Sequence, residues 1–414
     1  MQYFQPDALH FVGDCMPFYK DGIFHVYWLL DENHHQAMGG LGGHQWAHTA
    51  SRDLVHWQHF PLALGIDHES EKSICTGSVF YHDQMYYAFY STRRENWREE
   101  LCLATSPDGV HFTKYSANPI LKAPAGYTPI HFRDPFVYRN PQNGCLTMLL
   151  SAELQGKTGS TRGGCLARLT SSDLIHWSIE DPLLVPGYAC VPECSQWFEW
   201  NGWYYLLFSV FGETHYRIAE SPDGPWRIPV PDTLGNALVR VMKVAPFGER
   251  RIGVTYLASA QSDRWQYAGN MLFRELVQLE DGSLGTAFVP EMTPQGKPFS
   301  PTMQTEGGAW TVNSSAAFDL DAREGFTYAW VDSLPRDFRL QMTVEPADAP
   351  LAFGVCMSET ALGFDQGLQV SFQPAQQLLQ VQAASRAPFE VNGPAAVLVP
   401  EDMASPARME LGVT

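Results

Sequence analysis

The chain has 414 residues, and a prior of roughly 100–200 residues per domain predicts two or three units. Its formal net charge of −18 argues against nucleic acid or an anionic membrane surface as a partner, because both would repel it. No run of 18 apolar residues occurs, so we expect no transmembrane helix. The start, MQYFQPDALHF, lacks the basic and apolar regions of a signal peptide, which predicts a cytoplasmic protein.

The 8 cysteines are scattered without a CxxC pair, which is typical of reduced and mostly buried thiols in a cytosolic chain. Aromatic residues make up 13% of the chain. Trp and Tyr often line sugar-binding sites, but aromatics also favour β-sheets, so composition alone leaves both interpretations open. Oligomeric state is not predictable from these features.

Two phrases alternate along the first 290 residues. The first, a Ser, an acidic turn residue and an apolar or aromatic close, stands at SRDLVHW (51–57), SPDGVHF (106–112), SSDLIHW (171–177) and SPDGPW (221–226). The second is a turn followed by a short aromatic or β-branched run: DGIFHVYWL (21–29), HDQMYYAFY (82–90), NGCLTMLLSA (143–152), NGWYYLLFSV (201–210) and, more weakly, ERRIGVTYLA (249–258). Five copies of a hairpin unit predict a five-bladed β-propeller over residues 1–292. A sandwich would explain short strands but not the regular spacing.

Past residue 290 the phrases vanish. Residues 293–308 are rich in Pro, Gly and Thr and are predicted to be a linker. Alternating runs then predict a β-sandwich over residues 309–414, which makes the chain an all-β protein with a propeller followed by a C-terminal sandwich. The last residues, ARMELGVT, alternate like the beginning of a strand, so we expect either a sandwich interrupted at its C-terminus or a final edge strand.

Three acids stand about 7 to 9 residues ahead of a hairpin turn, just before the expected innermost strand of a blade: Asp14, Asp134 and Glu193. Equivalent positions of a repeat point to the same place, which in a propeller is the central channel. Three carboxylates there suit glycoside hydrolysis by a nucleophile, a general acid/base of raised pKa and a group that holds sugar hydroxyls. Arg133 would keep Asp134 ionised or bind substrate. The alternatives are a turn cap for Asp14, a structural ion pair for Asp134 and solvent exposure for Glu193.

Several segments resemble the fructosidases of glycoside hydrolase family 32, which include invertases, levanases, inulinases and sucrose-6-phosphate hydrolases. FRDPFV (132–137) is similar to the family's Arg-Asp-Pro motif, and PEC (192–194) to its Glu-Cys motif. HQWAHTASRDLVHWQHFPLAL (44–64), CTGSVFY (75–81) and RWQYAGNMLFRELVQLEDG (264–282) resemble further family segments. The resemblance covers nearly the whole chain and implies a five-bladed propeller with a C-terminal sandwich.

The resemblance implies a retaining hydrolase that cleaves small-molecule or oligosaccharide β-fructofuranosides without a metal or cofactor. Asp14 would be the nucleophile, Glu193 the acid/base, and Asp134 would grip sugar hydroxyls. The matched segments also imply substrate contacts for Arg133, Met16, Trp46, Thr76, Gly77, Cys194 and Trp265.

The first motif departs from the family's Trp-Met-Asn-Asp-Pro-Asn-Gly. Gly13 stands where the family has the Asn before the nucleophile, Met16 where it has the second Asn, and Leu29 or Trp28 where it has a Gln. A site built to bond hydroxyls discriminates strongly, because unmatched buried polar groups are costly. These replacements therefore predict a substrate that differs from that of an ordinary invertase.

Four histidines (His34, His35, His44 and His48) accompany a Gly-rich loop at residues 38–43. They allow a metal site, but the favoured interpretation is a pocket rim with one or two histidines on the substrate and no metal. Arg93 and Arg94 belong to a charged segment that is either a solvated face or a binding group for an anionic substituent such as a phosphate.

Three functions follow from the sequence: a fructoside hydrolase, a furanosidase or fructosyltransferase with another substrate, and a carbohydrate-binding propeller without catalysis. The presence of all three acids argues against the third.

Overall fold

The computed structural model describes residues 3–157, 159–235, 238–261, 264–293, 296–299, 302–314, 317–321, 327–331, 334, 338–345, 352–357, 367–376, 378–384, 395–398 and 407–413. The chain divides into two compact units, Met1–Thr293 and Pro294–Thr414, so the first unit ends one residue beyond the expected 292. Helical segments are short: α1 (Ala37–Gly40), η1 (Gly159–Thr161), η2 (Pro290–Met292) and η3 (Pro374–Gln376). None of the helices in the described ranges has the length and apolar character that crossing a membrane would need.

The strands of the first unit form three antiparallel sheets that divide into five blades in chain order. The pairs Glu213–Arg240 and Val12–Gly269 join blades 4, 5 and 1 into a single sheet. Blade 1 holds β2 (His10–Lys20), β3 (Ile23–Glu32), β4 (Gln45–Ser51) and β5 (Trp57–Leu64). Blade 2 holds β6 (Ser73–His82), β7 (Met85–Arg93), β8 (Glu99–Ser106), β9 (Thr113–Lys114) and β10 (Leu121–Lys122). Blade 3 holds β11 (Tyr127–Arg139), β12 (Leu146–Leu154), β13 (Gly164–Ser171) and β14 (Ser178–Ile179). Blade 4 holds β15 (Glu193–Trp200), β16 (Trp203–Val210) and β17 (Glu213–Ala219). Blade 5 holds β18 (Val239–Phe247), β19 (Arg250–Gln261), β20 (Arg264–Gln278) and β21 (Leu284–Ala287), and β1 (Tyr3–Phe4) pairs with β20.

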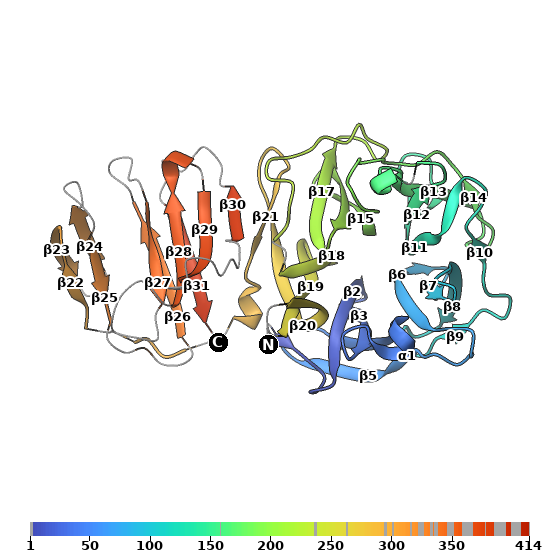
Figure 1. Ribbon diagram of the computed structural model, residues 1–414, viewed down its shortest axis with the longest axis horizontal. Helices are drawn as coiled ribbons and strands as arrows, with labels where there is room; N and C mark the ends of the chain where they lie inside the picture. Colours follow the sequence, from blue (N-terminus) through green and yellow to red (C-terminus); the bar gives the residue numbers. More distant parts are fainter. Residues whose placement is uncertain are drawn as a thin grey trace. The chain divides into compact units, whose positions relative to one another are not determined.

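The first strands of the five blades close a ring. β2 contacts β6, β6 contacts β11, β11 contacts β15, β15 contacts β18, and β18 returns to β2 (Figure 1). Closing the ring in this way leaves only short sheet edges, which is how propellers limit unpaired strands. The predicted five-bladed propeller is confirmed.

The repeated Ser-x-Asp phrase is the turn from the third to the fourth strand of a blade. In blade 1, Asp53 Oδ1 accepts hydrogen bonds from the backbone N–H groups of Val55 and His56, at 2.9 and 2.8 Å. Asp108 and Asp173 accept the same two bonds in blades 2 and 3. Each short polar side chain therefore folds its own turn locally, which is why the phrase could be recognised without the structure.

In every blade, the pairing register between the first strand and the second strand shifts within the first strand. The breaks lie between Val12 and Cys15, Ile74 and Gly77, Arg133 and Phe136, Glu193 and Gln196, and Arg240 and Lys243. A β-bulge adds a residue to one strand and re-aims its side chains. Asp134 (φ 57°) and Cys194 (φ 53°) adopt left-handed conformations there, which non-glycine residues rarely do. Asp14 and Asp134 thus lie inside their first strands, at bulges, so the expectation that they precede those strands is wrong. Glu193 is the first residue of β15, next to the bulge of that strand.

The second unit contains short antiparallel pairs and one sheet of four strands. β22 (Gln304–Glu306) pairs with β25 (Tyr328–Trp330), β23 (Ala309–Ser314) with β24 (Ala317–Asp321), and β26 (Phe338–Val344) with β31 (Ala407–Val413). The four-stranded sheet runs β27 (Phe353–Met357), β28 (Gly367–Gln373), β29 (Leu378–Ala384) and β30 (Ala395–Leu398). β22 falls inside the segment predicted to be a linker, where its backbone pairs with β25 despite the Pro- and Gly-rich surroundings.

Candidate active site

The bulges of the first strands surround a pocket of about 390 Å³, within the range of roughly 300–1,000 Å³ typical of small-molecule sites. Asp14, Asp134 and Glu193 all line it, so the structure brings together the three acids singled out in the sequence. The loop between β3 and β4 contributes His35 and His44 to the same pocket.

One carboxylate oxygen of Asp14 accepts hydrogen bonds, and the other has no hydrogen-bond partner among the described residues. The Thr76 hydroxyl donates to Oδ2 at 2.5 Å, and the Cys194 thiol donates to the same oxygen at 3.3 Å. Oδ1 has no hydrogen-bond partner among the described residues, although it is buried. An oriented carboxylate with one free oxygen in a pocket is suited to attack a bound electrophile.

Asp134 is fixed through Oδ2, which accepts hydrogen bonds from the Ser151 hydroxyl and from the Cys194 backbone N–H, both at 3.0 Å. The thiol of Cys194 donates to Asp14 and the backbone N–H of Cys194 donates to Asp134, so this cysteine connects the two carboxylates. Two like charges this close need compensation from nearby donors or cations.

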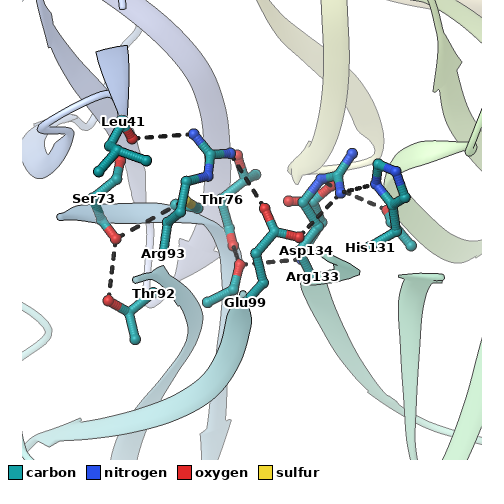
Figure 2. Close-up of polar contacts among 12 residues, drawn as sticks. Leu41, Ser73, Thr76, Thr92, Arg93, Glu99, His131, Arg133 and Asp134 are labelled. Atoms are coloured by element: carbon teal, nitrogen blue, oxygen red, sulfur yellow. Dashed lines mark hydrogen bonds and ion pairs between the residues drawn. The ribbon is translucent and has the colours of Figure 1, made fainter. Parts of the chain in front are cut away.

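Arg133 joins the third acid to a buried ion-pair network. Its Nη2 donates to Glu193 Oε1 at 2.7 Å and its Nη1 donates to Glu99 Oε2 at 3.0 Å. Figure 2 shows Glu99 between Arg133 and Arg93, whose Nη2 lies 3.2 Å from Glu99 Oε1. Both arginines line the pocket, but each is paired, while Arg94 bonds Glu100 instead. Arg133 therefore orients Glu193, and the network holds Arg133.

Burial raises the pKa of both Asp14 and Glu193 above that of an ordinary carboxyl group. The Thr76 hydrogen bond opposes this effect on the pKa of Asp14, and the Arg133 charge opposes it on the pKa of Glu193. The Glu193 side chain keeps 38% exposure, so it can still exchange protons with a ligand or water in the pocket.

The other predicted substrate contacts divide into two groups. Thr76, Cys194 and Arg133 line the pocket. Met16 and Trp46 are 2% and 0% exposed and pack behind its wall, as does Gly77, whose N–H lies 3.2 Å from Met16 Sδ. These three residues are not among those that line the pocket, so a direct substrate contact for them stays a prediction. Trp46 donates to the carbonyl of Cys75 at 2.9 Å. The side chain of Trp265 lies outside the described residues.

Tyr267 occupies the space that a side chain at Gly13 would need. A Cβ at Gly13 would stand 2.6 Å from the Tyr267 hydroxyl and 3.1 Å from Leu29 Cβ. The Asp14 backbone N–H donates to that hydroxyl at 3.4 Å, and Tyr267 lines the pocket next to Leu29. The family resemblance implies amide side chains at this part of the pocket wall. Here the wall consists of the Tyr267 phenol and the Leu29 side chain.

Lys243 lies under the pocket and was missed by the sequence reasoning. It is 2% exposed, and its Nζ donates to the carbonyl of Gly77 at 3.0 Å. Burial lowers its pKa, while Cys194, Asp134 and Asp14 raise it. The offset of about 7 to 9 residues ahead of Gly248 leads to residues 239–241, so repeat equivalence does not point to Lys243, at which β18 resumes its pairing with β19.

Asp31, His35 and His44 bring one possible metal-ligand atom each within 4.8 Å of one another. Arg93 Nη1, however, lies 3.1 Å from His35 Nε2, and a guanidinium only donates. A neutral His35 then carries its proton on Nδ1, which leaves that nitrogen without a lone pair for a metal. Burial, His44 and Arg93 lower the pKa of His35 to about 4. These contacts favour the interpretation in which the histidines form a hydrogen-bonding wall of the pocket.

A sequence profile described as "Glycosyl hydrolases family 32 N-terminal domain" matches residues 8–221, more than half of the 414-residue chain. The chain belongs to glycoside hydrolase family 32. The match contains all three acids, and the resemblance noted from the motifs is confirmed.

This family 32 chain is 32% identical over 190 residues to the sucrose-6-phosphate hydrolase of Escherichia coli, in an alignment covering 43% of the chain and 38% of that relative. It is 31% identical over 205 residues to the raffinose invertase of Escherichia coli, covering 47% of the chain and 40% of the relative. The matched segment thus spans about two fifths of the length of these curated relatives.

Solved structures of the family have the same fold. Fructan 1-exohydrolase IIa from Cichorium intybus matches with a TM-score of 0.72 at 16% identity, over 99% of this chain and 86% of its own. A Bombyx mori β-fructofuranosidase, solved in complex with sucrose, matches with a TM-score of 0.66 at 18% identity, over 99% and 84% of the two chains. These matches support the propeller and sandwich architecture of the family 32 chain.

Proposed function

We propose that this protein is a retaining glycoside hydrolase that cleaves a terminal β-fructofuranoside, either a small molecule or an oligosaccharide. The observation that carries the proposal is the pairing of two differently held acids in one pocket. Asp14 has an Oδ2 fixed by hydrogen bonds and a buried Oδ1 without a partner among the described residues, whereas Glu193 is oriented by Arg133 and remains partly exposed. A double displacement needs one carboxylate to attack and one carboxyl to transfer protons.

In the first step, a carboxylate oxygen of Asp14 forms a bond to the anomeric carbon while the glycosidic C–O bond breaks. Glu193 gives its proton to the departing oxygen. In the second step, Glu193 takes a proton from water, the water oxygen bonds to the anomeric carbon, and Asp14 leaves as a carboxylate. Asp134, with Arg133, holds ring hydroxyls while positive charge develops on the sugar, and only side chains and water take part.

The relatives support the substrate class. Their names include a sucrose-6-phosphate hydrolase and a raffinose invertase, and one structural neighbour was solved with sucrose. Because the matched segment spans only part of the curated relatives, their substrates enter here as candidates for this chain.

Product analysis with methanol as a competing acceptor tests the proposal. Incubation with sucrose, inulin, levan or raffinose in dilute methanol is expected to release fructose and methyl β-D-fructofuranoside, because retention delivers the acceptor to the same face. The α-anomer would contradict the double displacement, and no fructose from any of these substrates would contradict the function itself.

A second candidate is the hydrolysis of another furanoside. The observation that favours it is the pocket wall at Gly13, Leu29 and Tyr267, which lacks amide side chains. Arabinofuranosides in the same assay decide between the two, since a chain that releases arabinose and no fructose performs the second reaction.

The pH dependence offers a prediction about Thr76. Asp14 attacks only when ionised, so activity falls as the pH drops through its raised pKa; Glu193 donates only when protonated, so activity falls as the pH rises through its raised pKa. The Thr76 hydrogen bond lowers the pKa of Asp14. Thr76→Val should therefore move the acid limb of the kcat/KM profile to higher pH, with about a tenfold loss on that limb. An acid limb that stays in place would show that Thr76 does not tune Asp14.

A further inference from the structure

The turn between β16 and β17 carries an exposed aromatic side chain at the rim of the pocket. Phe211 is 70% exposed, and both Phe211 and Gly212 line the pocket. Val210 pairs with Glu213, so the turn contains only these two residues, with φ of 52° and 86°. Tight hairpin turns with two positive φ angles strongly favour Asn-Gly or Asp-Gly. Phenylalanine is therefore unfavourable at this position on local grounds.

Three other two-residue turns of the propeller have the same geometry with a residue that suits it. Asp21 (φ 51°), Asp83 (φ 46°) and Asn201 (φ 51°) occupy the first position in turns closed by the pairs Lys20–Ile23, His82–Met85 and Trp200–Trp203. Each joins the first strand of its blade to the second. A non-glycine, non-Asx residue in this conformation costs roughly 1–2 kcal/mol. Phe211 therefore departs from the Asx preference at the first position of these turns, although Gln84 (φ 61°) stands at the second position of one of them.

The position of this turn in blade 4 indicates a function for the locally unfavourable Phe211. Consecutive antiparallel strands turn at alternate ends, so the turn from the second to the third strand lies at the end opposite the other three. In blades 1 to 3 that end carries longer connections, residues 33–44, 94–98 and 155–163. In blade 4 that end of the blade carries only the two-residue turn formed by Phe211 and Gly212, which line the pocket. Single exposed apolar side chains are ordinary on protein surfaces, but one held in a strained turn on a pocket rim indicates function.

Phe211 also lies on the side of the pocket where a leaving group departs. Glu193 pairs with Ser209 across β15 and β16, and Phe211 follows Ser209 by two residues, in the turn just beyond the end of β16. A general acid stands next to the oxygen that it protonates, so the leaving group extends past Glu193. An exposed aromatic ring there can pack against the apolar face of a sugar, as aromatic side chains commonly do.

We propose that Phe211 is a stacking platform for a glycosyl leaving group at the mouth of the pocket. This inference rests on the proposed hydrolysis of β-fructofuranosides and assigns a binding residue for the part of the substrate that is released. The turn conformation fixes the ring outward, because its two-residue length and the close approach of Arg240 to Gly212 leave the backbone little freedom; a Cβ at Gly212 would stand 2.9 Å from Arg240 Cδ.

The test compares two substrates that share the fructosyl group and differ in the leaving group, sucrose and methyl β-D-fructofuranoside. In Phe211→Asn, the ratio of kcat/KM for sucrose to kcat/KM for the methyl fructoside should fall about tenfold, the loss expected for one aromatic stacking contact. The same variant should raise Tm by about 3 °C, because asparagine tolerates the left-handed conformation. Phe211→Leu keeps the strain and removes the ring, so its ratio should fall while its Tm does not rise.

Asp83→Phe is the matched control. It places phenylalanine in the same kind of turn at the opposite end of a blade, so it should lower Tm and leave the kinetic ratio unchanged. If the unaltered protein cleaves both substrates and Phe211→Asn keeps the ratio, the inference is wrong and the proposed function stands. If the unaltered protein cleaves neither substrate, the proposed function fails and the inference fails with it.

Discussion

Replacing Asp14 by asparagine is expected to lower the turnover of a cleaved β-fructofuranoside by at least about 10⁴-fold, because a neutral amide cannot form the covalent intermediate. The fold should not be destabilised, because burial raises the pKa of Asp14 and therefore penalises its charged form in the folded protein. The measurement is kcat on the preferred substrate together with the Tm of each variant.

Asp21→Asn is the matched control for this experiment. Asp21 lies in the exposed turn at the end of the same strand, at a positive φ that asparagine accepts, so its replacement should leave both turnover and Tm near those of the unaltered protein. Deamidation of the new asparagine would regenerate Asp14 and restore activity. Asp14→Ala is therefore measured as well, because alanine cannot revert in this way. Turnover within tenfold of the unaltered protein in a pure Asp14→Ala sample would show that Asp14 is not the nucleophile.

Replacing Glu193 by alanine should lower kcat/KM for sucrose by about 10³-fold, the contribution typical of a positioned general acid. The loss should be much smaller for p-nitrophenyl β-D-fructofuranoside, because its leaving group departs without protonation. Azide, which attacks without a general base, should restore turnover of that activated substrate. These outcomes are measured by initial rates on both substrates with and without azide.

A structural role for Glu193 would give a different pattern. Glu193 accepts a hydrogen bond from Arg133, so its removal could act by releasing that arginine. Equal losses on both substrates, without rescue by azide, would support this explanation and contradict the assignment as acid/base. Glu199→Gln, at an exposed position of the same strand, is the control and should leave both rates unchanged.

The environments of the two acids are the reason for proposing different roles for them, although burial raises the pKa of both. Asp14 receives hydrogen bonds from Thr76 and Cys194, which stabilise a carboxylate, and Lys243 places a buried cation nearby. Glu193 keeps partial exposure and a single arginine partner that also serves Glu99. A carboxylate held by several donors favours attack, and a carboxyl open to the ligand favours proton transfer.

Several parts of the site were predictable because they depend on equivalent positions of a repeat. Asp14, Asp134 and Glu193 precede hairpin turns by similar distances, and the structure places all three in one pocket. The same offset in the fifth copy leads to residues 239–241, so Lys243 could not be found in this way. The burial of Trp46 was not predictable from its motif, because neighbours that are distant along the chain cover the indole.

Local residue patterns were sufficient to predict the strands, their turns and the number of blades, because hairpin residues and Ser-x-Asp turns act within a few neighbours along the chain. The three acids were also predictable, because equivalent positions of a repeat lie at equivalent places in the fold. How those acids are held, and which residues surround them, depends on the tertiary structure. Cys194 bridges Asp14 and Asp134, Tyr267 fills the space at Gly13, and Phe211 reaches the rim, and each of these depends on ring closure and on bulges that join segments far apart in the chain.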